Sequence, residues 1–306
     1  MRRDVVIIGG GPAGLSAARL LAGRGLAVAL VHKAALGGEL PNQLWIEGYP
    51  CAGERTNGAQ VAAQLIAQAQ EVEAQFVLGE ATAIELYSHS VAVGLSDHRA
   101  IQASAVLVAT GRRRIAANEE IQSYEGRGLI ACTACDAGFY RGQTVVVAGG
   151  GLAGALDALQ LAAFAKRVVL VERGAALDCP ENLRRQIQAH PGIEVLLGAR
   201  VETARGAAGI ETVQVTTAEG VQTLPATGLS MQLGHSPETQ FLQGHGWLDS
   251  RGFVLADVAT RAVVPRVFAI GDARSGANWS VANAIEDARA VADGVMRSLN
   301  NTRRQA

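Results

Sequence analysis

The sequence VVIIGGGPAG, residues 5–14, joins an apolar β-branched run directly to a glycine-rich turn. Residues 15–21 follow with apolar side chains at helical spacing, and a second short apolar run occupies residues 27–31. Runs of this length are typical of buried strands, and the segment between them is typical of one helix. We therefore predict that this segment forms a strand, a helix and a parallel strand, the βαβ unit of an α/β fold.

The glycines of this turn have the spacing of a dinucleotide site. Gly9 allows the tight turn, Gly11 lets the backbone approach a pyrophosphate, and Gly14 lets the helix pack closely on its strand. Free N–H groups at the helix start then favour an anion. The spacing alone is weak evidence, but the strand before it and the helix after it favour a dinucleotide. Because the second strand ends in His32 and Lys33 rather than an acid, a simple NAD site is disfavoured.

The same order of elements recurs later in the chain. Residues 144–148 (TVVVA) form an apolar run, GGGLAG follows at residues 149–154, and a helical pattern continues to about residue 165. Another apolar run at residues 167–171 completes a second βαβ unit. The predicted fold class is therefore α/β, with two nested Rossmann-like (three-layer ββα/βαβ) nucleotide-binding domains.

The last elements of the chain are too short to form a domain of their own. Residues 267–270 are predicted to be a strand and residues 281–299 a helix, and both plausibly complete the first domain. We therefore expect a discontinuous first domain, residues 1–113 plus 245–306, and an inserted second domain, residues 114–244.

Composition excludes several classes of function. Hydrophobic residues make up 49% of the chain and charged residues 18%, as in globular proteins. The formal net charge of −1 gives no support for nucleic-acid or polybasic membrane binding. The longest apolar stretch, residues 145–165, is interrupted by glycines, Asp157 and Gln160, so no membrane span is predicted. We expect a cytoplasmic protein.

The sequence Cys132-Thr133-Ala134-Cys135-Asp136 places two thiols one helical turn apart, close enough to form a disulfide. At a helix N-terminus a thiolate is stabilised, and thiolates carry out disulfide exchange. Asp136 offers a carboxyl group that can move a proton. Two alternatives remain, a zinc half-site and a pair of buried structural cysteines. The first is disfavoured because the other cysteines, at positions 51 and 179, are isolated, so no metal site is expected.

The motifs taken together resemble the low-molecular-weight thioredoxin reductases. In chain order they are GGGPAG at Gly9, GGEL at Gly37, ATG at Ala109, CTACD at Cys132, GGG at Gly149, GHSP at Gly234 and AIGD at Ala269. They extend over essentially the whole chain, and their combination is far more specific than any one of them.

The resemblance implies that the first domain is an FAD-binding domain. The glycine turn would meet the pyrophosphate, residues 37–40 would run beside the ribityl chain and isoalloxazine, and residues 109–111 would close the site. Asp272 would contact the ribityl chain or pyrophosphate. Trp279 would stack on the isoalloxazine or fill a gap, and we expect the stacking. The positions carried over are Gly9, Gly11, Pro12, Ala13, Gly14, Gly37, Gly38, Glu39, Leu40, Ala109, Thr110, Gly111, Gly271, Asp272, Trp279, Ser280 and Val281.

The resemblance also assigns roles to the cysteine motif. Cys135 would face the flavin, Cys132 would attack an external disulfide, and Asp136 would be the acid–base group. The second domain would carry this motif and an NAD(P)-like site, formed by Gly149, Gly151, Gly154, Glu172 and Arg173.

Three segments depart from the family's pattern. After the strand at residues 167–171, where the family has a basic run that holds the NADPH 2′-phosphate, only Arg173 is basic, and Glu172 would favour a free ribose. Leu152 and Ala153 are apolar where the family is polar. Near the C-terminus, Trp279-Ser280-Val281 aligns with Arg-Gln-Ala of the family, and Glu286 and Asp287 replace a glycine-containing turn. NADH or NADPH use is therefore left open.

The predicted function is that of an FAD-dependent dithiol/disulfide oxidoreductase. Electrons would move between flavin and a thioredoxin-like protein, or a small dithiol or disulfide, through Cys132 and Cys135. A homodimer is expected from the resemblance. The alternatives are a dithiol oxidase that uses oxygen instead of NADPH, a ferredoxin-linked reductase, and a flavin redox sensor without turnover.

Overall fold

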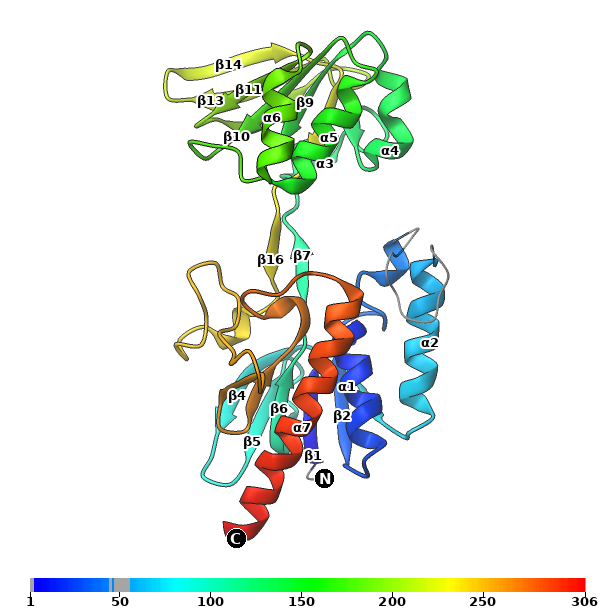
Figure 1. Ribbon diagram of the computed structural model, residues 1–306, viewed down its shortest axis with the longest axis vertical. Helices are drawn as coiled ribbons and strands as arrows, with labels where there is room; N and C mark the ends of the chain where they lie inside the picture. The colour runs from blue at the N-terminus through cyan, green and yellow to red at the C-terminus, as the bar shows by residue number, and fades with distance from the viewer. Residues whose placement is uncertain (1–2, 44–45, 47–55, 306) are drawn as a thin grey trace. The chain divides into compact units, whose positions relative to one another are not determined.

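The computed structural model describes residues 3–43, 46 and 56–305. The chain divides into two compact units (Figure 1). Unit 1 comprises Met1–Arg113 and Ser236–Ala306, and unit 2 comprises Arg114–His235. The chain thus returns to unit 1 at Ser236, earlier than residue 245, where the sequence analysis had placed the return. Within the described part of the chain, no helix is long and apolar enough to cross a membrane.

Unit 1 is built on a sheet in the order β17-β18-β6-β1-β2-β3, with β4 and β5 joined to it through β6. Its strands are β1 (Arg3–Ile8), β2 (Val28–His32), β3 (Gln75–Leu78), β4 (Ala81–Leu86), β5 (Val91–Leu95), β6 (Ala100–Val108), β17 (Ala262–Val264) and β18 (Val267–Ala269). The neighbours β3, β2, β1, β6 and β18 pair in parallel. The predicted first βαβ unit is therefore present.

Both faces of the β1 strand are buried, which explains why its sequence is apolar at every position after Asp4. Val5 and Ile7 face a core shared with the helices α1 (Pro12–Ala22), α2 (Gly58–Gln70) and α7 (Val281–Gln305). Val6 and Ile8 face a second core on the side of β4 and β5. Three layers result: the β4–β5 hairpin, the central sheet and the helices (Figure 1).

Unit 2 contains a parallel sheet in the order β11-β10-β9-β15-β8 and an antiparallel sheet β12-β13-β14. The strands are β8 (Leu129–Ile130), β9 (Thr144–Ala148), β10 (Arg167–Glu172), β11 (Ile193–Leu197), β12 (Arg200–Arg205), β13 (Thr212–Thr217), β14 (Gly220–Pro225) and β15 (Gly228–Met231). The helices are α3 (Glu119–Gln122), α4 (Thr133–Asp136), α5 (Leu152–Ala162) and α6 (Glu181–Ala189). Both units are Rossmann-like, as predicted.

Short segments complete the two units. The strands β7 (Arg112–Arg114) and β16 (His235–Pro237) pair with each other where the chain passes between the units. The described residues include four 3-10 turns, η1 (Leu40–Asn42), η2 (Ala137–Tyr140), η3 (Gln240–Leu242) and η4 (Gly271–Ala273). The helix predicted at residues 281–299 continues to Gln305, because the sequence after Leu299 contains neither glycine nor proline to end it.

Candidate functional site

The first glycine turn brings β1 and α1 into close contact. A Cβ atom at Gly14 would lie 1.9 Å from the carbonyl oxygen of Gly9, so only glycine permits this packing. At Gly11, by contrast, a Cβ atom would meet no protein atom within 4 Å. Pro12 begins α1, and the first N–H groups of a helix have no partner within the helix. The turn therefore offers open space beside free N–H donors, as an anion requires.

Three segments distant in the sequence meet at this turn. In the loop at residues 37–40, Gly37 N–H donates to the Gly10 carbonyl at 2.8 Å. Thr110 lies against Gly9, since a Cβ atom at Gly9 would be 2.9 Å from the Thr110 Cα. A Cβ atom at Gly271 would be 2.8 Å from the Ala13 Cβ. The predicted FAD positions are thus brought together.

Some of the predicted positions have side chains that pack in the core or cap a helix. The side chains of Leu40 and Ala109 are buried in the helix-side core of unit 1, and Val281 packs against it. Ser280 Oγ accepts the Asn283 N–H at 3.2 Å at the start of α7. Glu39 is exposed and directly precedes η1.

Arg112, Asp272 and Trp279 form a cluster in unit 1. The Arg112 Nε donates to Asp272 Oδ2 at 3.0 Å, and its guanidinium lies 4.3 Å from the centre of the Trp279 ring. Trp279 is 44% exposed, and the stacking of its indole on a flavin stays a prediction. Sequence reasoning did not single out Arg112, because its partners follow more than a hundred residues later in the chain.

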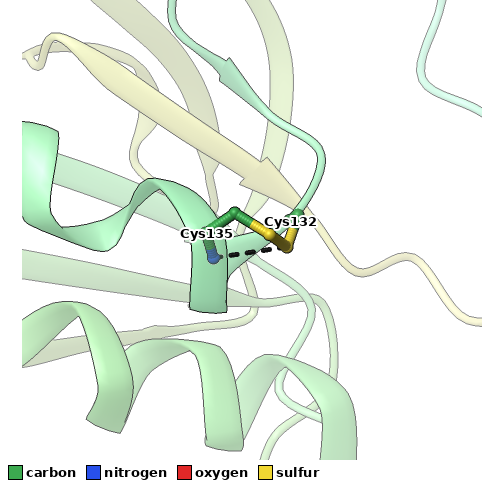
Figure 2. The surroundings of a disulfide bond; sticks show 2 residues. All are labelled: Cys132 and Cys135. Carbon is green, nitrogen blue, oxygen red and sulfur yellow. Dashed lines mark hydrogen bonds between the residues drawn. A yellow bond between two sulfur atoms is a disulfide. The ribbon is translucent and has the colours of Figure 1, made fainter. Parts of the chain in front are cut away.

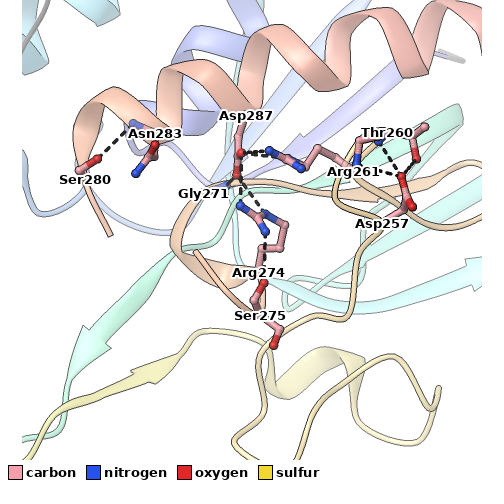
Figure 3. A network of polar contacts seen from close by, with 10 residues as sticks. Asp257, Thr260, Arg261, Gly271, Arg274, Ser275, Ser280, Asn283 and Asp287 are labelled. Atoms are coloured by element: carbon pink, nitrogen blue, oxygen red, sulfur yellow. Dashed lines mark hydrogen bonds and ion pairs between the residues drawn. The ribbon is translucent and has the colours of Figure 1, made fainter. Parts of the chain in front are cut away.

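A buried carboxylate fixes the turn that carries Asp272 (Figure 3). Asp287 on α7 accepts the Gly271 N–H at 2.9 Å and bonds the Nε atoms of Arg261 and Arg274 at 2.8 and 3.2 Å. In the sequence, Asp287 stands out only as a departure from the family's pattern. The available signal was an acid among the apolar positions Ala284, Ala288 and Val291 at helical spacing.

In unit 2, Cys132 and Cys135 form a disulfide (Figure 2). Cys132 precedes α4, and its Sγ accepts the N–H of Cys135 at 3.2 Å. Cys135 is exposed and Cys132 is half-buried. Burial of the Tyr140 hydroxyl raises the pKa of Tyr140, and the negative charge of the Asp136 carboxylate raises it further. Close by in the chain, Phe139 is 78% exposed. The pair is thus an accessible disulfide, and an exposed aromatic residue follows it four residues later in the chain.

Cys179 is not part of this disulfide. Cys179 is a buried free thiol, and burial raises its pKa above the ordinary value. Cys51 lies outside the described residues. Among the residues that the structure describes, no group of three or more His, Cys, Asp or Glu side chains could hold a metal ion.

The second glycine turn repeats the backbone packing of the first. A Cβ atom at Gly154 would lie 1.7 Å from the Gly149 carbonyl oxygen, and Gly151 precedes α5 as Gly11 precedes α1. Glu172, however, does not extend a free carboxylate. Its two oxygens accept the N–H groups of Gly150 at 2.5 Å and Gly174 at 2.6 Å. Arg173 is exposed, and so is Leu152 at the start of α5.

Two Rossmann-like units, one with an open glycine turn and the other with an accessible redox disulfide, define a flavin-linked disulfide oxidoreductase. Residues 3–290 match the family described as Pyridine nucleotide-disulphide oxidoreductase, and the chain belongs to this family. It is 33% identical to the thioredoxin reductase of Streptomyces coelicolor over 279 residues, which cover 88% of this chain and 85% of the relative. The thioredoxin reductase of Streptomyces clavuligerus is 32% identical over 277 residues, with the same coverage.

Solved structures agree with the sequence comparison. The crystal structure of Lactococcus lactis thioredoxin reductase superposes with a TM-score of 0.76 at 25% identity, and covers 98% of this chain and 99% of that one. The protein is therefore an FAD-dependent disulfide oxidoreductase of the low-molecular-weight thioredoxin-reductase-like family. These comparisons do not favour the oxidase, ferredoxin-linked or sensor alternatives.

The described residues of unit 1 fit FAD. Besides the open turn at Gly11, two polar side-chain atoms, Thr110 Oγ1 and Arg112 Nη1, are buried without a hydrogen-bond partner in the described part of the chain. Buried polar groups are nearly always satisfied, so these atoms suit the oxygens and nitrogens of a bound cofactor.

Proposed function

We propose that the protein transfers electrons between FAD in unit 1 and a thioredoxin-like protein, through the disulfide of unit 2. The observation that carries the proposal is the accessible Cys132–Cys135 disulfide, with one sulfur already hydrogen-bonded to a backbone N–H. We assign the FAD-binding domain to unit 1 and the NAD(P)-like domain to unit 2. We further propose that the protein works as a homodimer in the cytoplasm, as its resemblance to the thioredoxin reductases suggests.

The chain's own residues account for the exchange chemistry. FAD, when bound, supplies the electron pair that opens the Cys132–Cys135 disulfide. The Cys132 thiolate, stabilised by the Cys135 N–H, attacks one sulfur of the substrate disulfide and releases the other as a thiol. Cys135 then attacks Cys132 in the mixed disulfide, which restores the internal disulfide and releases the second substrate thiol. Asp136 would deliver the protons to the departing thiolates.

A protein substrate is favoured over a small one by the surface next to the disulfide. Phe139 is 78% exposed, and exposed aromatic side chains are common anchors at protein interfaces. A small dithiol would gain little from a ring on the surface, whereas a thioredoxin-like domain can cover it. Phe139 is therefore proposed as part of the docking surface.

The test is anaerobic electron transfer. The purified protein is photoreduced under argon and mixed with oxidised thioredoxin, while flavin absorbance and new thiols are followed. We expect the flavin to reoxidise with two thiols formed per thioredoxin. Phe139→Ser should raise the thioredoxin concentration required for half-maximal rate, whereas Tyr87→Ser, an exposed aromatic residue of unit 1, should not. Failure of the parent to reduce any protein disulfide would overturn the proposal.

A further inference from the structure

Arg112 stands at the edge of the unit 1 sheet where a cofactor is expected. It follows β6 by a few residues, and open α/β sheets bind ligands beyond the carboxyl ends of their parallel strands. Thr110, two residues earlier, lies against Gly9 of the glycine turn. The side chain of Arg112 is only 16% exposed. A guanidinium with so little exposure requires partners.

Only part of that requirement is met by the protein. Asp272 accepts from Nε at 3.0 Å, and the face of the guanidinium is covered by the Trp279 ring at 4.3 Å. These two contacts fix the plane of the guanidinium. The Nη1 atom is buried and has no hydrogen-bond partner among the residues that the structure describes, and the same is true of Thr110 Oγ1. An unsatisfied charged donor is costly, so its retention points to a ligand acceptor.

The neighbouring arginine shows that this arrangement is not a general property of β7. Arg113 is 61% exposed and pairs with Glu238 at 2.6 Å. Its charge is both solvated and neutralised by the protein. Arg112 differs from Arg113 because its side chain is largely buried and its Nη1 donor has no hydrogen-bond partner among the described residues.

We propose that Arg112 is a cofactor-contacting residue that donates from Nη1 to an oxygen acceptor of FAD. Asp272 and Trp279 act as positioning residues that hold the guanidinium in place. The proposal rests on the assignment of FAD to unit 1. It also gives the Trp279 indole a defined role, since one of its faces supports the guanidinium.

The experiment compares FAD binding to the apoprotein of three variants and the parent. Arg112→Met removes the donors and the charge at similar length, Arg112→Lys keeps the charge, and Arg113→Met is the matched control. Affinity is measured from the quenching of flavin fluorescence, and apoprotein stability from thermal unfolding. Because a charged hydrogen bond contributes ~1.5–3 kcal/mol, Arg112→Met should weaken FAD binding about 10- to 100-fold. Arg113→Met should bind as the parent does.

The flavin midpoint potential identifies the acceptor. A lower potential in Arg112→Met that Arg112→Lys restores would place the guanidinium at the isoalloxazine, since a cation favours the negatively charged reduced ring. Weaker binding at an unchanged potential would place it at the ribityl or pyrophosphate oxygens. Both results support the proposal. Unchanged FAD affinity and potential, with a less stable apoprotein, would show a structural role and overturn it. Absence of FAD binding by the parent and the control would overturn it together with the FAD assignment.

Discussion

A single backbone N–H distinguishes the two redox cysteines. The Cys135 N–H points at the sulfur of Cys132 at 3.2 Å, whereas no such donor is described for the sulfur of Cys135. A negative charge on sulfur is stabilised by such a donor, so reduction of the disulfide should leave the thiolate mainly on Cys132. We therefore propose that Cys132 attacks the substrate disulfide, the role that the family resemblance gives to it.

Serine variants separate the two roles. Cys135→Ser should abolish electron exchange between flavin and dithiol while FAD stays bound, because serine cannot form the internal disulfide. Cys132→Ser should also lose turnover but leave a thiol at Cys135 that gives a long-wavelength charge-transfer band with the flavin. Anaerobic absorbance spectra detect the charge-transfer band, and assays of thioredoxin reduction measure the loss of turnover. Cys179→Ser, at a buried thiol, serves as the control with parental activity. Parental turnover in both redox variants would make the pair structural.

The buried thiol of Cys179 predicts a pH dependence of stability. Burial raises its folded-state pKa above the ordinary value of 9.0, so the folded state retains a proton that the unfolded state loses. The contribution of this thiol to the free energy of unfolding is fully present below pH 9.0 and is lost as the pH rises through the folded-state pKa. Urea unfolding should give a difference in the free energy of unfolding between the parent and Cys179→Ala that becomes smaller above pH 9.0. A constant difference across the range would contradict the prediction.

At the scale of elements, Asp287 ties α7 to the η4 turn and to the segment before β17. Its side chain is 4% exposed, and those of its partners Arg261 and Arg274 are 13% and 10% exposed. Removing one partner of a buried ion pair leaves uncompensated charge, which is more damaging than loss of a surface pair. The Gly271 N–H would lose its acceptor as well.

Asp287→Ala should therefore lower the free energy of unfolding by about 3–5 kcal/mol, the range for a broken buried pair. Asp287→Asn should lower the free energy of unfolding by less, because the amide oxygen can still accept the Gly271 N–H. Glu286→Ala is the matched control, since Glu286 is the adjacent acid and is exposed. Chemical unfolding of the apoprotein measures all three. Equal stabilities of the Glu286 and Asp287 variants would show that the network contributes nothing.

Elements with local signals were predictable from the sequence. The strands β1 and β9 are apolar over residues 5–8 and 145–148 because both of their faces are buried there, and the glycine turns follow them directly. The return of the chain at Ser236 and the contacts of Arg112 and Asp287 were not predicted. These features depend on pairs far apart in the sequence, such as Arg112 with Asp272, for which no periodicity gives a signal.

At the scale of the molecule, two turns with the same backbone geometry differ in their chemistry. The turn at Gly11 is open, and Thr110, whose buried Oγ1 has no hydrogen-bond partner among the described residues, lies against Gly9. Both features suit FAD. At the second turn, Glu172 places a carboxylate on the N–H of Gly150, and Leu152 is apolar and exposed. An anionic phosphate is favoured at the first turn and opposed by the carboxylate at the second.

This difference predicts that NADPH is a poor electron donor, worse than NADH. The 2′-phosphate is normally held by bidentate arginines, and here Arg173 is the one basic residue among residues 173–178, directly after β10, and follows Glu172 in the sequence. Losing two charge-assisted contacts of ~1.5–3 kcal/mol each weakens binding by about two to four orders of magnitude. Stopped-flow flavin reduction under argon is the measurement. The Glu172→Gln variant should show a smaller difference between the rates of flavin reduction by NADH and by NADPH. Saturable reduction by micromolar NADPH, faster than by NADH, would show that the carboxylate does not govern the choice of donor.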